Sequence, residues 1–215
     1  MSNEGFDFKK LISDSIDTLT KPKEYFESMK TTGGLVEPII KAVIYGAVAG
    51  LLYFIWGLLH LGVGGALIGG AVGFMAFIWV LIGSIIGLFI GAVVILVLSA
   101  IAKGNIDFEA CTRVTASIMV LMPVSALLSF LSALSFKLFS VISLLINLYG
   151  LWLLFNGLVY SLKANKKTSQ IILLVLVGII VLFMLAGLGT KRATDRYMKN
   201  LDKESREMLK DFGIN

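Results

Sequence analysis

Few residues in this sequence are able to do acid–base or nucleophilic chemistry. Its 215 residues include one histidine, His60, and one cysteine, Cys111. No acidic residue lies from Pro38 to Ile106 or from Ala110 to Thr194, which together contain all the predicted membrane spans. A nucleophile needs a neighbouring base, and a disulfide or multi-cysteine metal site needs a second thiol. We therefore expect no catalytic residue, no metal ligand and no cofactor, and a protein that is not an enzyme.

The one strongly polar break in the middle of the chain is the segment 103–109, KGNIDFE. Gly104 is expected to end the preceding helix, and Asn105 or Asp107 to cap the next one. Glu109 precedes Arg113 by four residues, the spacing of a helical ion pair. This segment is either a solvated loop with good helix caps or a contact site for another protein. The candidate partner contacts are Asn105, Asp107, Glu109 and Arg113.

Glycines recur at intervals of four within the longest uncharged stretch, Ala42 to Ala102. As a helix this stretch would extend roughly 90 Å, about three times the bilayer's hydrocarbon core, so it must cross a membrane more than once. Helices in lipid associate through close approach at small residues, and a glycine-lined pore is the alternative interpretation. The predicted packing residues, which could also join copies into a homo-oligomer, are Gly46, Gly50, Gly65, Gly69, Gly73, Gly83, Gly87 and Gly91, with a later stripe of Ser143, Asn147 and Gly150.

These elements predict an all-α integral membrane protein, a bundle of five transmembrane helices. The expected spans are residues 38–59, 77–102, 112–133, 139–162 and 171–188. Residues 61–76 are either a helical extension of the second span or a short re-entrant piece. Pro123 is expected to kink the third span because it removes a backbone donor.

Amphipathic segments flank the spans. In the N-terminal segment 1–37, Phe8, Leu11, Ile12, Ile16 and Leu19 share one helical face, and a second short helix is expected to begin at Pro22. These helices lie either in the membrane interface or on the protein's own surface. After the membrane domain, residues 38–189, the tail 190–215 is expected to form another amphipathic helix.

The formal net charge is +5, with the basic residues in loops and at the ends, so a nucleic-acid partner is not expected. The start, MSNEGFDFKK, does not resemble a cleavable signal peptide. Basic residues concentrate in the segments that five spans place on the N-terminal side, which predicts a cytoplasmic N-terminus. The tail does not obey this rule, because its basic residues would lie outside.

Three motifs point to a family. They are a PxxxF element at Pro22 to Phe26, the segment GNIDFEACTRVTASIMVLMP from Gly104 to Pro123, and LYGLWLL from Leu148 to Leu154. Together with five spans, they resemble the Yip domain family over residues 22–189. Its eukaryotic members are Ypt/Rab-interacting multi-spanning membrane proteins, and the short polar N-terminus resembles the prokaryotic branch. None of the motifs is catalytic, and no functional residue is transferred.

The resemblance implies a non-enzymatic membrane organiser or adaptor. Its expected partners are the lipid bilayer and other membrane or peripheral membrane proteins. The alternatives are a transport component, either a small channel or an accessory subunit of an exporter, and a lipid-handling membrane protein. The expected location is the cell membrane or, in a eukaryote, the membrane of the endoplasmic reticulum or Golgi.

Overall fold

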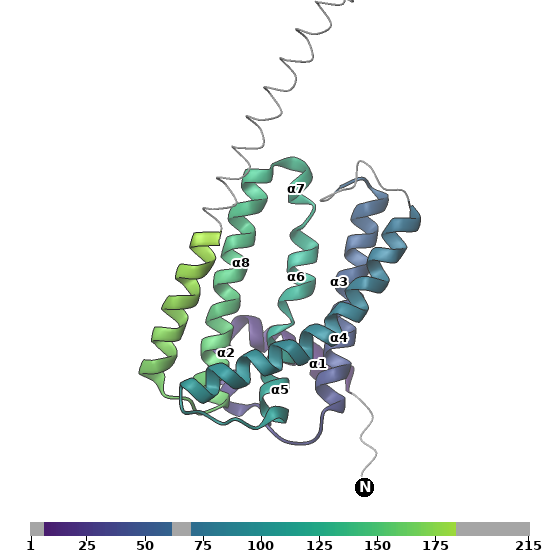
Figure 1. The fold of residues 1–215 in the computed structure, drawn as a ribbon. Coiled ribbons are helices and arrows are strands. Elements are labelled where there is room, and N and C mark those ends of the chain that lie inside the picture. Colours follow the sequence, from purple (N-terminus) through teal and green to yellow (C-terminus); the bar gives the residue numbers. More distant parts are fainter. Residues whose placement is uncertain (1–6, 62–69, 184–215) are drawn as a thin grey trace, which may run out of the picture. The chain divides into compact units, whose positions relative to one another are not determined.

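The computed structural model describes residues 7–61 and 70–183, and every regular element within those ranges is helical (Figure 1). The helices are α1 (Phe8–Thr20), α2 (Pro22–Ser28), α3 (Val36–Leu58), α4 (Gly70–Ile101), α5 (Phe108–Ile118), α6 (Leu121–Leu128), α7 (Leu131–Leu134), α8 (Phe136–Asn156) and the π-helical turn η1 (Gly157–Ser161). A further helix runs from Lys166 to Phe183.

Five helical segments in the described residues are long and apolar enough to cross a membrane, which confirms the predicted fold class. They are Val36–Leu58, Phe77–Ile101, Phe108–Leu134, Lys137–Ser161 and Lys166–Phe183. The chain forms two compact units, Met1–Leu173 and Leu174–Asn215, and the contacts described below belong to the first. Residues 184–188 of the last expected span and the amphipathic tail 190–215 lie outside the described residues.

The third span is broken twice rather than kinked once. α5 ends at Ile118 and α6 begins at Leu121, which places Pro123 in the first turn of α6. A proline at this position lacks the N–H that would continue an α5 helix, so the helix must restart before it. A second break follows at Ser129, whose hydroxyl donates to the Ala126 carbonyl at 2.8 Å and so competes with the helical ladder.

The second span is longer than its apolar core requires. α4 begins at Gly70, so residues 70–76 extend the span expected from residue 77 as a helix rather than as a re-entrant piece. Residues 62–69, which include Gly65 and Gly69, lie outside the described residues.

Glycines allow α3, α4 and α5 to approach closely. A Cβ at Gly46 would collide with Ser84 of α4, and one at Gly50 would lie 2.8 Å from Phe77. On the other side of α4, a Cβ at Gly91 would lie 2.6 Å from the Thr115 methyl of α5. These contacts match the close approach of backbones at small residues that holds helices together in lipid.

The remaining predicted packing positions behave differently. A Cβ at Gly83 or Gly87 would meet nothing within 4 Å, so the structure does not bring them against another described helix, contrary to a continuous three-glycine face. That Gly83 and Gly87 pack against a second copy of the chain therefore stays a prediction. No contact of Gly73 is described. In the later stripe, Gly150 faces Leu121 of α6. Ser143 is half-buried and Asn147 is exposed and bonded within α8.

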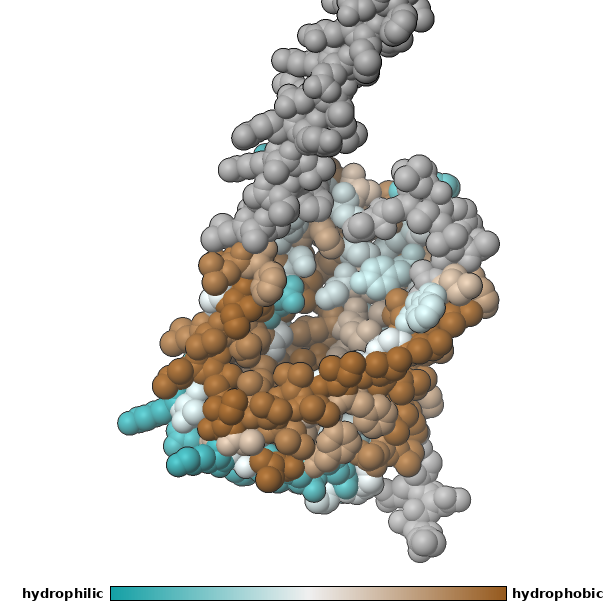
Figure 2. All heavy atoms as spheres, viewed as in Figure 1, coloured by the Kyte–Doolittle hydropathy of each residue, from teal (hydrophilic) through white to brown (hydrophobic). Residues whose placement is uncertain are grey.

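The ends of the first unit differ in polarity. Figure 1 shows α1, α2 and the start of α5 at one end of the helices and α7 at the other. Figure 2 shows hydrophilic residues gathered at the α1–α2 end, below a hydrophobic band over α4. We call the α1–α2 end the polar end. Its core contains Phe26 of α2, which is fully buried with Val114 of α5 and Leu158 of η1.

Candidate functional site

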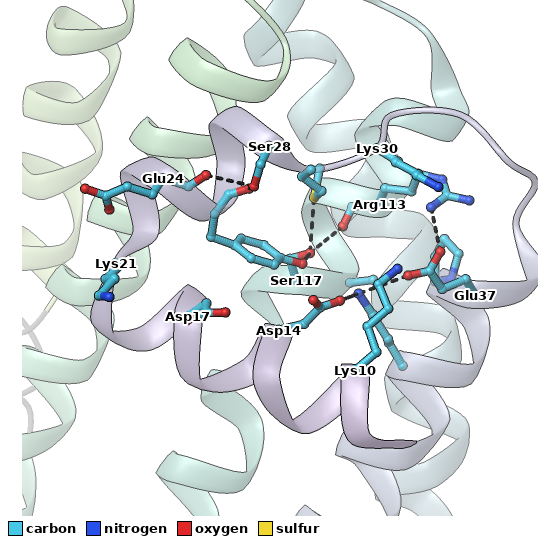
Figure 3. A pocket seen from close by; sticks show the side chains of 15 residues that line it. Lys10, Asp14, Asp17, Lys21, Glu24, Ser28, Lys30, Glu37, Arg113 and Ser117 are labelled. Carbon is cyan, nitrogen blue, oxygen red and sulfur yellow. Dashed lines mark hydrogen bonds and ion pairs between the residues drawn. The ribbon is translucent and has the colours of Figure 1, made fainter. Parts of the chain in front are cut away.

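A charged pocket of about 410 Å³ lies at the polar end, between α1, α2, the start of α3 and α5 (Figure 3). Its lining mixes basic, acidic and hydroxyl side chains, unlike the apolar surface of the spans. The charged residues that line it are Lys10, Asp14, Asp17, Lys21, Glu24, Lys30, Glu37, Lys41 and Arg113.

Arg113 forms one side of the pocket and is only 7% exposed at its side chain. Its Nη1 lies 2.8 Å from Glu37 Oε2 and its Nε 3.1 Å from Glu109 Oε1. Its Nη2 donates to the Gly34 carbonyl at 2.9 Å. The planar guanidinium thus binds three groups in different directions, which an ammonium group would not reproduce. Two of these groups, Glu37 and the Gly34 carbonyl, join α5 to the start of α3.

Lys41 extends the same network to α1. Its Nζ lies 2.8 Å from Asp14 Oδ2 and 3.2 Å from Glu37 Oε1, with a side chain 8% exposed. Glu37 therefore bridges Lys41 and Arg113. Buried charges are tolerated when they are paired and hydrogen-bonded in this way, whereas removing one partner strands the others. The network holds α1 and α5 on α3.

Hydroxyl groups complete the docking of α1 and α2. The Ser15 and Tyr45 hydroxyls lie 2.7 Å apart, and the Tyr25 hydroxyl lies 2.9 Å from that of Ser117. The Tyr149 hydroxyl of α8 donates to the carbonyl of Leu19 at 2.7 Å. Because each bond satisfies a polar group on a half-buried surface, α1 and α2 are held as part of the bundle.

The PxxxF element has a structural explanation. Pro22 occupies the first position of α2, where its missing N–H and fixed φ are suited to starting a helix. Phe26, one turn later, is fully buried. A Cβ on Gly157 of η1 would lie 2.5 Å from Val114 and 3.5 Å from the Phe26 ring, so glycine leaves the space in which that ring packs.

Two loops of the polar end are joined by backbone hydrogen bonds. Asn105 N donates to the Leu162 carbonyl at 2.7 Å, and Asn165 N donates to the Ala102 carbonyl at 2.8 Å. The Ser99 hydroxyl donates to the Asn105 carbonyl at 2.6 Å. We call the exposed residues of these loops the loop-pair surface: Lys103, Asn105, Ile106, Asp107, Lys163, Asn165, Lys166 and Lys167.

The end of α4 differs from the sequence-based expectation. Lys103, not Gly104, adopts the left-handed backbone conformation, with φ of 55°. Glycine is needed at 104 for a different reason, because a Cβ there would lie 2.8 Å from Ala164 and 2.9 Å from the Leu162 carbonyl. Close approach of the second loop, rather than helix termination, explains this residue.

The four candidate partner contacts fall into two groups. Asn105 and Asp107 are exposed, and Asp107 caps α5 by accepting from Ala110 N at 2.8 Å. Glu109 and Arg113 are used internally, since Glu109 also accepts from Gly34 N at 2.6 Å. A change at Glu109 or Arg113 would therefore disturb folding before it tested binding.

The network had a signal in the sequence that our interpretation missed. Glu37 and Lys41 have helical ion-pair spacing at the start of a span, and Arg113 follows the start of another. An ionisable residue within a membrane helix is expected to have a partner inside the protein. The pairing of Glu37 with Arg113, 76 residues apart, was not predictable from spacing.

Other chemistry-bearing residues are not brought together. His60 is exposed beyond α3, whereas Cys111 is buried in α5. Within residues 7–61 and 70–183, no group of three His, Cys, Asp or Glu side chains is arranged to hold a metal ion. The charged side chains that the structure does bring together dock α1 and α5 on α3.

Comparison with known protein families relates these features to one family. No curated protein and no solved structure matches the chain. The model of the Yip1 domain matches residues 16–188, a range that contains all three motifs, both loops of the loop-pair surface and the pocket's helices except the first two turns of α1. Because that match covers most of the 215 residues, the chain belongs to the Yip1 domain family.

Proposed function

We propose that this protein is a non-enzymatic membrane organiser or adaptor that binds other membrane or peripheral membrane proteins. It is a multi-pass membrane protein, and its family consists in general of non-enzymatic membrane-trafficking proteins that bind membrane partners. The adaptor role of this particular chain rests on its own surface, as follows.

The observation that carries the proposal is the loop-pair surface. Two loops about 60 residues apart in sequence are joined through Asn105 and Asn165, so the charged groups they carry are held in a defined arrangement. Ile106, 59% exposed, adds an apolar side chain to the same surface. A pre-organised patch that combines an exposed apolar side chain with charged groups loses less conformational entropy on binding, which favours a protein partner.

We further propose that the polar end faces the cytoplasm and that the protein lies in the cell membrane. Lys163, Lys166 and Lys167 all belong to the polar end, whereas Lys137 begins the opposite end of the fourth span. Basic residues accumulate in cytoplasmic loops, which supports this orientation.

The orientation has a direct test in intact cells. In a Cys111→Ser background, Lys137→Cys should react with a membrane-impermeant thiol reagent and Lys166→Cys should not. Both lysines are exposed, so burial cannot explain a difference between them. Labelling of Lys166→Cys with protection of Lys137→Cys would reverse the proposed topology.

The adaptor role is tested by affinity capture of the full chain from native membranes in mild detergent, followed by identification of the captured proteins. One variant combines Lys103→Gln with Lys166→Gln, and a second carries Ile106→Ser. The matched control combines Lys9→Gln with Lys137→Gln, which removes the same charge at exposed positions away from the loops.

We expect the free energy of unfolding of both loop variants to lie within about 0.5 kcal/mol of the wild-type value, because the changed side chains are exposed. They should capture at least tenfold less of a partner that the control captures at the wild-type level. Removing an interfacial anchor costs roughly 1–2 kcal/mol of binding free energy or more. Equal capture by wild type, control and both loop variants would remove the loop-pair surface from consideration.

A further inference from the structure

The helix α1 has three distinct faces. Leu11 and Thr18 are buried against the bundle, at 5% and 1% exposure. Asp14 and Asp17 line the charged pocket. Ile12, at 60% exposure, presents a third, apolar face with Ile16. An amphipathic helix that packs on its protein with one face and leaves another apolar face exposed is suited to the membrane interface.

The contacts of α1 give its depth. The Ser15 hydroxyl lies 2.7 Å from that of Tyr45, which is nine residues into α3. At 1.5 Å per residue, the Tyr45 backbone lies about 14 Å from the start of α3, and its side chain leans back toward that start. The helix α1 therefore runs beside the membrane span rather than beyond its end. An apolar face exposed beside the charged start of a span is suited to the membrane interface, where lipid headgroups lie, and the polar side of the same helix lines the pocket.

The pocket's cations are not equivalent. Lys41 and Arg113 are already paired with carboxylates of the network. Among the described residues, no ion pair involves Lys10, Lys21 or Lys30, although all three line the pocket. In Figure 3, Lys10 and Lys30 lie on the side of Arg113 and Glu37, whereas Lys21 lies with Glu24 on the other. Two cations on one side are thus left for a ligand.

The lining carries five basic and four acidic groups, a net charge of +1. One phosphodiester monoanion balances that charge, whereas a more highly charged phosphate would leave an excess of negative charge. The volume of about 410 Å³ lies within the range of small-ligand sites and accommodates a headgroup. The acyl chains of the same lipid would remain in the bilayer, beside the apolar face of α1.

We propose that the charged pocket binds the phosphodiester headgroup of an anionic membrane phospholipid, with Lys10 and Lys30 holding the phosphate oxygens. The ion-pair network of Asp14, Glu37, Lys41 and Arg113 keeps the pocket's walls in place and limits the charge that the pocket accepts. This site is separate from the loop-pair surface, so it goes beyond the proposed adaptor role.

The test uses the full purified chain in a mild, uncharged detergent. Binding of dioleoyl phosphatidylglycerol is measured by native mass spectrometry and by the shift of the melting temperature, with dioleoyl phosphatidylcholine and water-soluble glycerophosphoglycerol as comparison ligands. The variant combines Lys10→Gln with Lys30→Gln, both exposed side chains whose replacement should not impair folding. The control combines Lys9→Gln with Lys137→Gln, neither of which lines the pocket.

We expect phosphatidylglycerol to bind the wild type and the control within twofold of each other, and the Lys10/Lys30 variant at least about tenfold more weakly, the loss expected for charge-assisted hydrogen bonds. The soluble ligand should bind more weakly than the lipid because it gains nothing from the apolar face of α1.

Several results would overturn the inference. Equal binding of the lipid to the variant and the wild type would remove the two lysines as ligands. Equal binding of phosphatidylcholine would contradict the charge argument, and equal binding of glycerophosphoglycerol would identify a soluble phosphate compound instead. Capture of a protein partner that is lost in the Lys10/Lys30 variant, with lipid binding retained, would assign the pocket to an acidic peptide. If the loop variants capture partners as well as the wild type, the adaptor proposal loses its support, but the lipid-binding measurement is unaffected. The two proposals can therefore fail separately.

Discussion

The second and third spans show how differently hydropathy and burial are related in this protein. The span Phe77–Ile101 within α4 is the most hydrophobic of the five, yet only 22% of its most apolar window is buried. The span Phe108–Leu134, which contains Arg113, is less hydrophobic and has 39% buried. In water the more apolar helix would be the inner one. In lipid, burying apolar side chains within the protein brings no comparable gain, so polar groups decide which helix is central.

The polar residues of α5 illustrate the point. All eight residues from Ala110 to Ser117 are buried. The hydroxyls of Thr112, Thr115 and Ser117 each donate to the carbonyl four residues earlier, at 2.7, 2.8 and 3.0 Å. Such bonds satisfy hydroxyls inside a helix without a partner from another element. Ser117 also lies 2.9 Å from the Tyr25 hydroxyl of α2, and Arg113 reaches outside its helix to Glu37 and to the Gly34 carbonyl.

The largest effect should therefore follow from Arg113→Met, which removes the central cation of α5 while preserving its apolar stem. Glu37 and Glu109 would lose their shared partner, and breaking a buried pair in this way costs about 3–5 kcal/mol. Thermal unfolding in detergent is the measurement. Lys166→Met, at an exposed position, is the control and should change stability by less than about 0.5 kcal/mol. Similar melting of both variants would mean that the network does not hold α5 in place.

A smaller effect is expected where α4 meets α5. In Gly91→Ala, the new methyl group would lie 2.6 Å from the Thr115 methyl, so one helix must move, at a cost of about 1–3 kcal/mol. Gly87→Ala, one turn earlier, meets nothing within 4 Å and should raise stability by up to about 1 kcal/mol through helix propensity.

The same denaturation assay compares these two alanines on one helix. Destabilisation by Gly87→Ala as large as that by Gly91→Ala would indicate that the open glycine face packs against a second copy of the chain. An oligomeric state that changes with Gly87→Ala would support that reading.

The smallest effects separate two buried serines of the polar end. The Ser99 hydroxyl donates to the Asn105 carbonyl, so Ser99→Ala should destabilise the protein by about 1 kcal/mol. The Ser169 hydroxyl is buried and has no hydrogen-bond partner among the residues that the structure describes, so Ser169→Ala should be neutral or stabilising by up to about 1 kcal/mol. Hydrogen exchange of the Asn105 and Asn165 amides would report the loops directly. A cost for Ser169→Ala equal to that for Ser99→Ala would contradict the assignment.

The sequence by itself determined that the chain lies in a lipid bilayer, how many spans it has and where local helix signals occur. A long uncharged run can satisfy its backbone in lipid only as helices, so five spans follow from hydropathy. A cap of α5 at Asn105 or Asp107, the Glu109–Arg113 pair and a disturbance at Pro123 depend on neighbours a few residues away, which the sequence displays. The structure selects Asp107 as the cap and shows the disturbance at Pro123 as a break.

Only the tertiary structure decided which helix faces are internal. Gly46 and Gly91 pack against neighbouring helices, whereas Gly83 and Gly87 face no other part of the chain that the structure describes, although all four belong to similar series. In a bilayer, the periodicity of apolar residues does not indicate which helix face is internal, because lipid and protein interior are equally apolar. The pairings of Glu37 with Arg113 and of Asp14 with Lys41 join segments far apart in sequence, and no spacing rule connects them. The charged pocket exists because those pairings place α1, α3 and α5 around one space.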